Sequence, residues 1–173
     1  MKITVNIQAQ VFKSNLIQGF GIGIFILLLF PALLFANTTQ EIQSILQQKK
    51  APIGVVFEVL ENEEKDIIWT LQKINQASQK LRQRFPKIGI AVVSHGNELF
   101  ALTKDKKSAY SKVHSLVEQM NRNNIPIQVC GTAASWKQKT ISDFPNYIDV
   151  VEAAPEKIEF YEDLGYLLIE VTR

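Results

Sequence analysis

The sequence has one cysteine in 173 residues. This scarcity excludes an intrachain disulfide framework and any zinc site built from several cysteines. A strong charge of either sign is also lacking, because 19 basic and 17 acidic residues leave a formal net charge of +2. A nucleic-acid-binding protein that works through bulk charge needs a larger basic excess. We therefore expect no nucleic-acid partner.

The usual phosphate-binding loops are missing as well. Neither GxGxxG nor GxxxxGK[ST] follows the first predicted strand, which continues as ENEEKD at residues 61–66. Acidic residues at that position would repel a phosphate group, so nucleotide binding by these loops is disfavoured. We expect no cofactor and no metal ion, and there is no signature of a nucleotide or metal hydrolase.

Charge is absent from a long N-terminal stretch. No charged residue occurs between 14 and 40, and the run 20–35 reads FGIGIFILLLFPALLF. A basic flank, an apolar run and the small residue Ala36 before a polar one are the layout of a secretory signal peptide. The 21 residues of 16–36 are also about enough to span a bilayer uncut. Residues 1–36 are thus predicted to be a signal peptide or a membrane anchor, and both alternatives stay open.

Either alternative places the rest of the chain outside the cytoplasmic membrane, with the lysine-bearing end inside. We expect a periplasmic protein, or one anchored to the inner membrane with its domain in the periplasm. Residues 1–36 carry two lysines and no acidic residue, so the formal charge of the remainder is zero. The polar segment 37–51 is predicted to be a tether or a short helix, and 52–173 the folded domain.

Two hydrophobic periods alternate along residues 52–173. Short apolar runs rich in β-branched residues predict buried strands, and apolar residues at helical spacing predict helices between them. The predicted strands are 53–60, 87–94, 125–130, 147–151 and 166–171, and the predicted helices are 64–85, 97–103, 108–121 and 155–163. Residues 131–140 are predicted to be a loop that can open into a short helix. This alternation indicates an α/β sandwich of three layers, with a mainly parallel sheet covered on both faces.

Polar residues with chemical potential follow the predicted strands. In open α/β sheets, ligands bind beyond the carboxyl ends of the strands. His95 and Gly96 follow the second strand, and Cys130, Gly131 and Thr132 end or follow the third. Backbone N–H groups of a turn after Cys130 can stabilise its thiolate, and Gly131 allows a bound group to approach the backbone closely. We therefore predict Cys130 as the reactive residue, with Gly96, Gly131 and Thr132 as pocket candidates.

Each of these residues also has a purely structural interpretation. Cys130 can be a small buried apolar residue, and His95 can either deprotonate the thiol or simply bond to backbone at a strand end. Asn75, on the first predicted helix, is a further pocket candidate, although a plain polar surface position accounts for it equally. Trp136 can cover the thiol pocket or fill a protein contact. His114 lies inside a helix and is expected to be packed or solvated.

Three motifs follow each other along the folded domain. They are the His-Gly in VVSHGNELFAL (residues 92–102), the Val-Cys-Gly-Thr in NNIPIQVCGT (123–132), and the Leu-Gly-Tyr in the closing segment 143–171. In this order they resemble the DsrE/DsrF-like sulfur-relay family, and its exported branch in particular. The resemblance runs over roughly residues 53–171 and includes the apolar first strand. No single motif is diagnostic, and the set gains its specificity from its order and spacing.

The resemblance implies a fold and a chemistry. The fold would be a five-stranded parallel sheet of strand order 4-3-2-1-5, assembled as a homotrimer or homohexamer. The cysteine that matches Cys130 would carry sulfur as a persulfide and exchange it with a donor or acceptor protein. For His95, the resemblance implies only a position at the end of a strand. Two functions stay open, namely a sulfur carrier or transferase acting through Cys130, and a non-catalytic oligomeric binding or assembly module in which Cys130 is structural.

Overall fold

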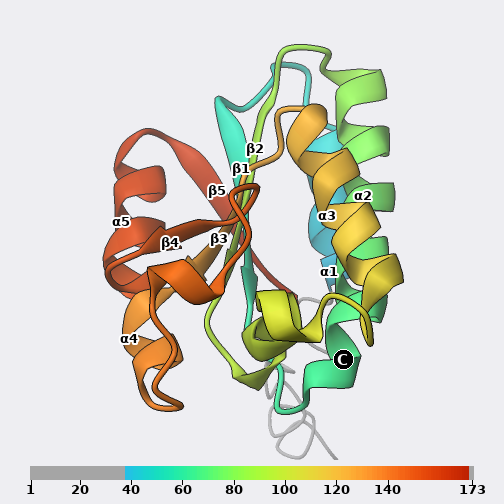
Figure 1. Cartoon of the computed structure of the whole chain (residues 1–173). Helices are drawn as coiled ribbons and strands as arrows, with labels where there is room; N and C mark the ends of the chain where they lie inside the picture. Colours follow the sequence, from blue (N-terminus) through green and yellow to red (C-terminus); the bar gives the residue numbers. More distant parts are fainter. Residues whose placement is uncertain (1–37, 172–173) are drawn as a thin grey trace, which may run out of the picture. The chain divides into compact units, whose positions relative to one another are not determined.

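The computed structural model describes residues 38–171, which form an α/β domain around a five-stranded, all-parallel sheet (Figure 1). The strands lie in the order β4-β3-β2-β1-β5, so the expected parallel sheet and its strand order are confirmed. The strand bounds are β1 (Gly54–Val59), β2 (Gly89–Ser94), β3 (Ile127–Cys130), β4 (Asp149–Val151) and β5 (Tyr166–Val171).

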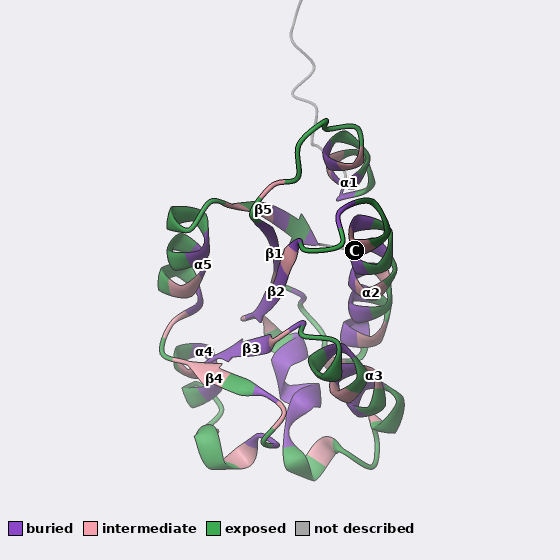
Figure 2. Ribbon diagram, turned by 90° about the horizontal axis from the view of Figure 1, so that it is seen from above, coloured by how far each residue is buried: buried purple, intermediate pink, exposed green. Residues whose placement is uncertain are grey.

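Helices cover both faces of this sheet. The helices α1 (Thr38–Leu46), α2 (Ile67–Arg84) and α3 (Ser111–Arg122) lie on one face, whereas α4 (Gly131–Ser135) and α5 (Ala154–Asp163) lie on the other (Figures 1 and 2). The three inner strands β1, β2 and β3 are buried along nearly their whole length, but the edge strand β4 is partly exposed. Burial on both faces explains why the inner strands are continuous apolar runs.

The segment 37–51 contains a helix that packs onto the domain. α1 buries Ile42 and Ile45 against α2 and β5, and the Thr38 hydroxyl donates a hydrogen bond to the Glu170 carbonyl at 3.1 Å. Of the two alternatives for this segment, the described residues therefore contain the short helix. The predicted signal peptide or anchor at 1–36 lies outside the described residues. Within 38–171, no helix combines the length and the apolar character needed to cross a membrane.

The connections after β2 are tighter than the sequence pattern suggests. The expected helix at 97–103 is a 3-10 helix, η3 (Asn97–Leu102), and it is followed by a second, η4 (Lys104–Lys106). Short 3-10 turns also occur before α2 as η2 (Glu64–Asp66) and before β4 as η5 (Ile141–Asp143). Hydrophobic period alone does not separate a 3-10 turn from an α-helix over so few residues, because both place residues i and i+3 close together.

His114, which was expected to be either packed or solvated, is packed inside the domain. Its Nε2 lies 3.1 Å from the Ala101 carbonyl, and its Nδ1 lies 2.7 Å from the Tyr147 hydroxyl. A carbonyl can only accept, so Nε2 carries the proton and the Tyr147 hydroxyl donates to Nδ1. Burial lowers the pKa of His114 below its ordinary value, and the hydrogen bond to Ala101 offsets part of this effect. The imidazole thus joins α3 to η3 and to the entry of β4 in its neutral form.

This arrangement predicts a pH-dependent stability. Because the pKa of His114 is lower in the folded than in the unfolded chain, the unfolded chain binds the proton first, and the free energy of unfolding should fall as the pH drops below about 6.5. Urea denaturation at several pH values, with His114→Gln for comparison, measures this effect. Burial raises the pKa of Glu98 above its ordinary value of 4.5. Between that ordinary value and the raised pKa, protonation of Glu98 increases the free energy of unfolding as the pH falls, which opposes the effect of His114. Parallel pH curves for the native chain and His114→Gln would contradict the assignment.

Candidate functional site

The register of the sheet places three polar side chains on the face that α4 and α5 cover. Glu58 pairs with Val93, and Val93 pairs with Gln128. Side chains alternate between the two faces of a strand, so His95 shares the face of Val93, and Cys130 shares the face of Gln128. Ser94 pairs with Val129, which brings His95 and Cys130 to adjacent positions at the carboxyl edge of the sheet. The structure therefore brings Glu58, His95 and Cys130 to one edge and one face.

A buried carboxylate organises the loops at this edge. Glu98 is fully buried in η3, where its Oε1 accepts a hydrogen bond from the Ser94 hydroxyl at 2.7 Å and another from the Gly96 amide at 3.0 Å. Its Oε2 accepts a hydrogen bond from the Glu61 amide at 2.8 Å. Burial raises the pKa of the Glu98 carboxyl, and these hydrogen bonds offset part of that rise. One side chain thereby joins the loop after β1 to the loop after β2.

Gly96 is required for the close approach of these two loops. A Cβ built on Gly96 would lie 2.2 Å from the Glu98 Oε2, 2.5 Å from the Glu61 carbonyl oxygen and 2.6 Å from the Glu61 nitrogen. Two of these atoms belong to the backbone, which cannot move aside as a flexible side chain can. Gly96 is therefore a structural element of the site edge, and this gives a physical reason for the His-Gly pair in the sequence.

His95 bonds to a carboxylate that we did not predict as a partner. Its Nε2 lies 2.7 Å from the Glu58 Oε1, and about a fifth of each side chain is exposed. In the neutral ring, Nε2 donates to this carboxylate, so Nδ1 is the nitrogen that can accept a proton. A groove of about 150 Å³ opens beside the pair and is lined by Glu58, Leu60, Glu170 and Val171.

Cys130 stands at the junction of β3 and α4. Its side chain is 5% exposed, and its Sγ accepts a hydrogen bond from the Ala133 amide at 3.4 Å, which caps α4. Gly131 lies close to β4, because an added Cβ would be 3.0 Å from the Val151 carbonyl oxygen. Thr132 fixes the same turn through its amide and its hydroxyl, both of which donate to the Glu152 carbonyl. Gly131 and Thr132 thus hold the backbone that surrounds the thiol.

Asn75, the further pocket candidate, lines a groove that is separate from this edge. It lies on α2, which covers the opposite face of the sheet, and it lines a different groove with Gln79, Arg82 and Asn123. Helical spacing alone could not reveal which face of the sheet the helix covers. Trp136 follows α4 but is 78% exposed, so its ring is directed to solvent.

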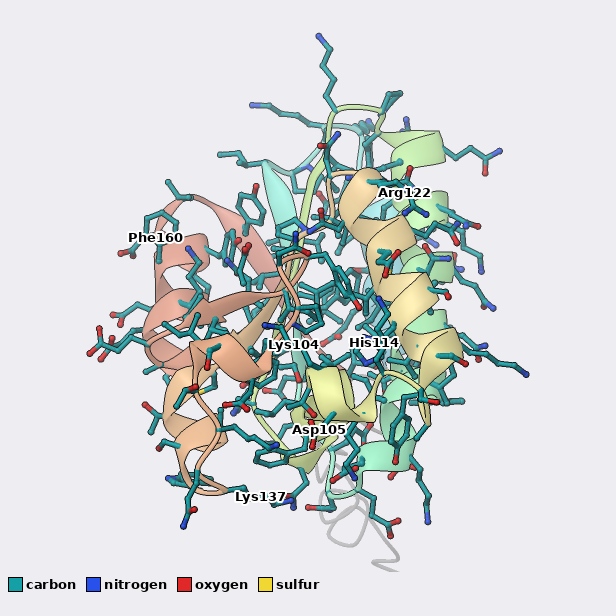
Figure 3. The ribbon with its side chains drawn as sticks, viewed as in Figure 1. Lys104, Asp105, His114, Arg122, Lys137 and Phe160 are labelled. Carbon is teal, nitrogen blue, oxygen red and sulfur yellow. The ribbon has the colours of Figure 1, made fainter. Side chains whose placement is uncertain are left out.

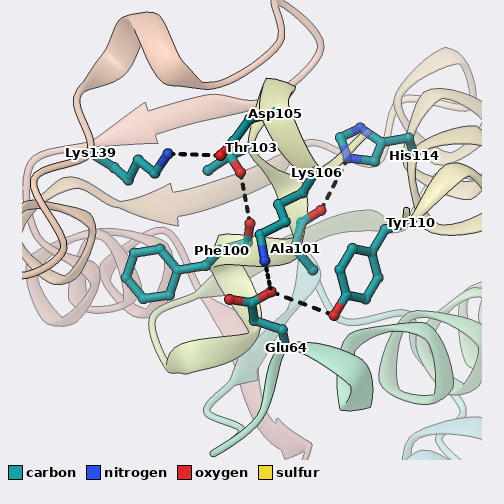
Figure 4. A network of polar contacts seen from close by, with 9 residues as sticks. All are labelled: Glu64, Phe100, Ala101, Thr103, Asp105, Lys106, Tyr110, His114 and Lys139. Atoms are coloured by element: carbon teal, nitrogen blue, oxygen red, sulfur yellow. Dashed lines mark hydrogen bonds and ion pairs between the residues drawn. The ribbon is translucent and has the colours of Figure 1, made fainter. Parts of the chain in front are cut away.

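A second set of polar contacts supports the loops around the site (Figure 4). Glu64, at the start of η2, accepts a hydrogen bond from Lys106 at 2.9 Å and lies 3.5 Å from the Tyr110 hydroxyl. Asp105 pairs with Lys139 at 3.1 Å. Hydrogen bonds from Thr103 and Lys139 lower the pKa of Asp105. These contacts join the segment after β1 to η4 and to α3, and they join η4 to the loop after α4.

Two residues of the site, Glu58 and Glu98, were not predicted from the sequence. Glu58 lies inside the apolar run IGVVFEVL, where its charge is the only available signal. Glu98 lies in a short predicted helix, where an acidic residue is ordinary. Within residues 38–171, no cluster of three or more His, Cys, Asp or Glu side chains is positioned to bind a metal ion.

We predict that Gly96→Ala destabilises the domain by about 1–3 kcal/mol, the usual cost of forcing a methyl group into a packed site. The added Cβ would displace the Glu61 backbone or the Glu98 carboxylate and so break hydrogen bonds at the edge. Urea denaturation measures the loss. Asn97→Ala is the matched control, because Asn97 is exposed in the same loop and should change stability by less than about 0.5 kcal/mol. Equal stability of the two variants would contradict this role of Gly96.

Comparison with known proteins supports the fold alone. No protein-family model and no curated protein matches the chain. Among solved structures, the chain is similar to the protein of unknown function MTH1491 from Methanobacterium thermoautotrophicum, with a TM-score of 0.55 and 17% sequence identity. The match covers 68% of this chain and 97% of that one. At this identity, the two proteins share a fold, and neither assigns a function to the other.

Proposed function

We propose that this chain is an exported, DsrE-like sulfur carrier that holds sulfur on Cys130. The observation that carries the proposal is the position of the Cys130 Sγ. It lies at the carboxyl edge of the sheet, accepts a hydrogen bond from the Ala133 amide, and stands beside the strand that leads to His95. An amide that donates to sulfur also stabilises the negative charge of a thiolate or a persulfide. The three sequence motifs and the observed strand order support the family assignment.

The chemical step is a transfer of sulfane sulfur. The Cys130 thiolate attacks the outer sulfur of a donor such as thiosulfate, a new S–S bond forms, and the old S–S bond breaks with its electron pair leaving on sulfite. The products are the Cys130 persulfide and sulfite, so charge and atoms balance. A second thiolate, on an acceptor protein, can then take the outer sulfur by the same exchange.

His95 and Glu58 supply a base for this step. Glu58 accepts a hydrogen bond from Nε2, which orients the ring and leaves Nδ1 to take a proton. His95 takes the thiol proton of Cys130 before attack, and the Glu58 carboxylate stabilises the imidazolium that results. The adjacent positions of His95 and Cys130 at the sheet edge support this assignment.

Burial of the thiol fits the proposed location. An exposed thiol in an oxidising compartment tends to form mixed disulfides. Cys130 is only 5% exposed, so small donors have better access to it than large ones. Delivery of sulfur to a protein would then require a displacement of α4, whose five residues follow Cys130 directly.

One observation favours the second candidate function, a non-catalytic assembly module. The layer that contains α4 and α5 exposes Trp136, Phe160 and Leu164 to solvent, at 78%, 50% and 48%. Phe160 of α5 is labelled in Figure 3. Large exposed apolar side chains are common where two subunits meet. A homotrimer or homohexamer, as the family resemblance implies, would cover them, and Cys130 would then have only a packing role.

Sulfur transfer to the folded chain separates the two candidates. We expect the full chain, incubated with thiosulfate or polysulfide, to gain the mass of one sulfur atom in intact-mass measurements. Cys130→Ala should show no gain, and His95→Gln should slow the gain by about 10²-fold, the usual contribution of a general base. Asn97→Ala is the matched control and should react at the native rate.

The pH profile of the transfer rate separates a base from a merely structural histidine. If His95 is the base, His95→Gln changes the shape of the profile, whereas a structural role lowers the rate equally at every pH. A folded native chain that gains no sulfur from either donor would refute the carrier function and leave the assembly module.

A further inference from the structure

One stripe of α2 combines an aromatic ring with two positive charges. Trp69, Lys73, Gln76 and Lys80 follow each other at spacings of four, three and four residues, which places them on one side of the helix. The ammonium group of Lys73 lies 4.8 Å from the centre of the Trp69 ring, and 38% of Trp69 is exposed. No acidic residue occurs anywhere in α2 (Ile67–Arg84).

A groove between α1 and α2 runs along this stripe. Its volume is about 110 Å³. It is lined by polar and apolar side chains from both helices, namely Thr38, Thr39, Ile42, Gln43, Lys73, Gln76, Ala77 and Lys80. The amide groups of Gln43 and Gln76 and the ammonium groups of Lys73 and Lys80 supply donors on both walls. A phosphate group has the size and the charge for such a groove, since its oxygens accept hydrogen bonds and its charge pairs with lysine.

The acidic residue of α1 does not line this groove. Glu41 is the only acidic residue in α1, and it is near Glu170 of β5, whose charge adds to the effect of burial in raising the pKa of Glu41. By contrast, α5 on the other side of the sheet carries Glu156, Glu159, Glu162 and Asp163, with Lys157 as its single basic residue. The domain is neutral as a whole, but its two helical layers carry opposite charge. Only the layer with α1 and α2 suits an anionic surface.

Chain connectivity fixes how far this groove can be from the apolar N-terminal run. That run ends at Ala36, and α1 begins at Thr38, whose side chain also lines the groove. Two residues of fully extended chain span at most about 7 Å. If residues 16–36 stay in the membrane, the start of α1 must be at the membrane surface.

We propose that the groove between α1 and α2 binds the phosphate of an anionic phospholipid headgroup. Lys73 and Lys80 pair with the phosphate, and Trp69 lies at the level of the headgroups, where indole rings are enriched. Binding at this groove turns the α2 side of the domain toward the membrane and the acidic α5 side away from it. The inference requires the uncut form of the N-terminal segment and does not depend on Cys130.

Lysine footprinting on the membrane-inserted full chain tests the proposal. The chain is placed in nanodiscs of pure phosphatidylcholine, or of phosphatidylcholine mixed with phosphatidylglycerol, and treated with an amine-reactive reagent. We expect modification of Lys73 and Lys80 to fall several-fold only when phosphatidylglycerol is present. Lys157 on α5 is the internal control and should react equally in both. Equal modification of Lys73 and Lys80 in the two lipids would overturn the proposal.

Two further arms distinguish a lipid headgroup from a free anion and an anchored chain from a cleaved one. Glycerol phosphate added to phosphatidylcholine nanodiscs should give no protection, and protection there would mean a site for free anions instead. An intact mass of the membrane-expressed protein that lacks residues 1–36 would also overturn the proposal.

Substitution gives an independent readout. Lys73→Gln with Lys80→Gln should reduce the retention of phosphatidylglycerol by the purified full chain about fivefold for each lysine, as expected for lysines at an anionic surface. The matched control, Lys112→Gln with Lys157→Gln, removes the same charge elsewhere and should retain the lipid as the native chain does. Equal retention by the two double variants would contradict the assigned site.

Discussion

The carboxylate of Glu98 is the interaction on which the functional edge of this domain depends. It is fully buried and accepts hydrogen bonds from Ser94, Gly96 and Glu61, so it holds the loops after β1 and β2 in one arrangement. A buried carboxylate without such donors would be strongly unfavourable, and buried amides without an acceptor would be unfavourable too. His95 lies between Ser94 and Gly96, and the same contacts therefore position it toward Glu58.

The proposed chemistry requires a thiol that is both held and protected. Ala133 donates to the Cys130 sulfur, and the backbone around Gly131 and Thr132 packs on the end of β4. Such rigidity favours one orientation of the sulfur and limits oxidation, at the cost of slow access for large reactants. The opposite charges of the two helical layers add a separate constraint, because they would orient a membrane-anchored domain without involving the sulfur site.

Most of the fold follows from the sequence, but the partners within the site do not. Runs such as IGVVFEVL and KIGIAVVS predict buried strands because they are short, rich in β-branched residues and almost continuously apolar, as a sheet covered on both faces requires. The partner of His95 could not be predicted, since it depends on the register between β1 and β2, and the sequence does not state that register. The place of Asn75 could not be predicted for a related reason: a helix pattern shows which side of the helix is polar, but not which face of the sheet the helix covers. Glu98 gave no signal, because its role arises from burial.

Accessibility of the Cys130 sulfur in the folded chain tests the central claim most directly. The measurement is the rate at which iodoacetamide, a small neutral reagent, alkylates the native full chain at neutral pH, compared with the chain unfolded in guanidinium. Because Cys130 is the only cysteine, intact mass reports its state without ambiguity. The sulfur-carrier account predicts complete alkylation of the folded chain, more slowly than that of the unfolded chain but without unfolding. A thiol that stays unmodified until the chain unfolds would contradict that account and make Cys130 a packing residue.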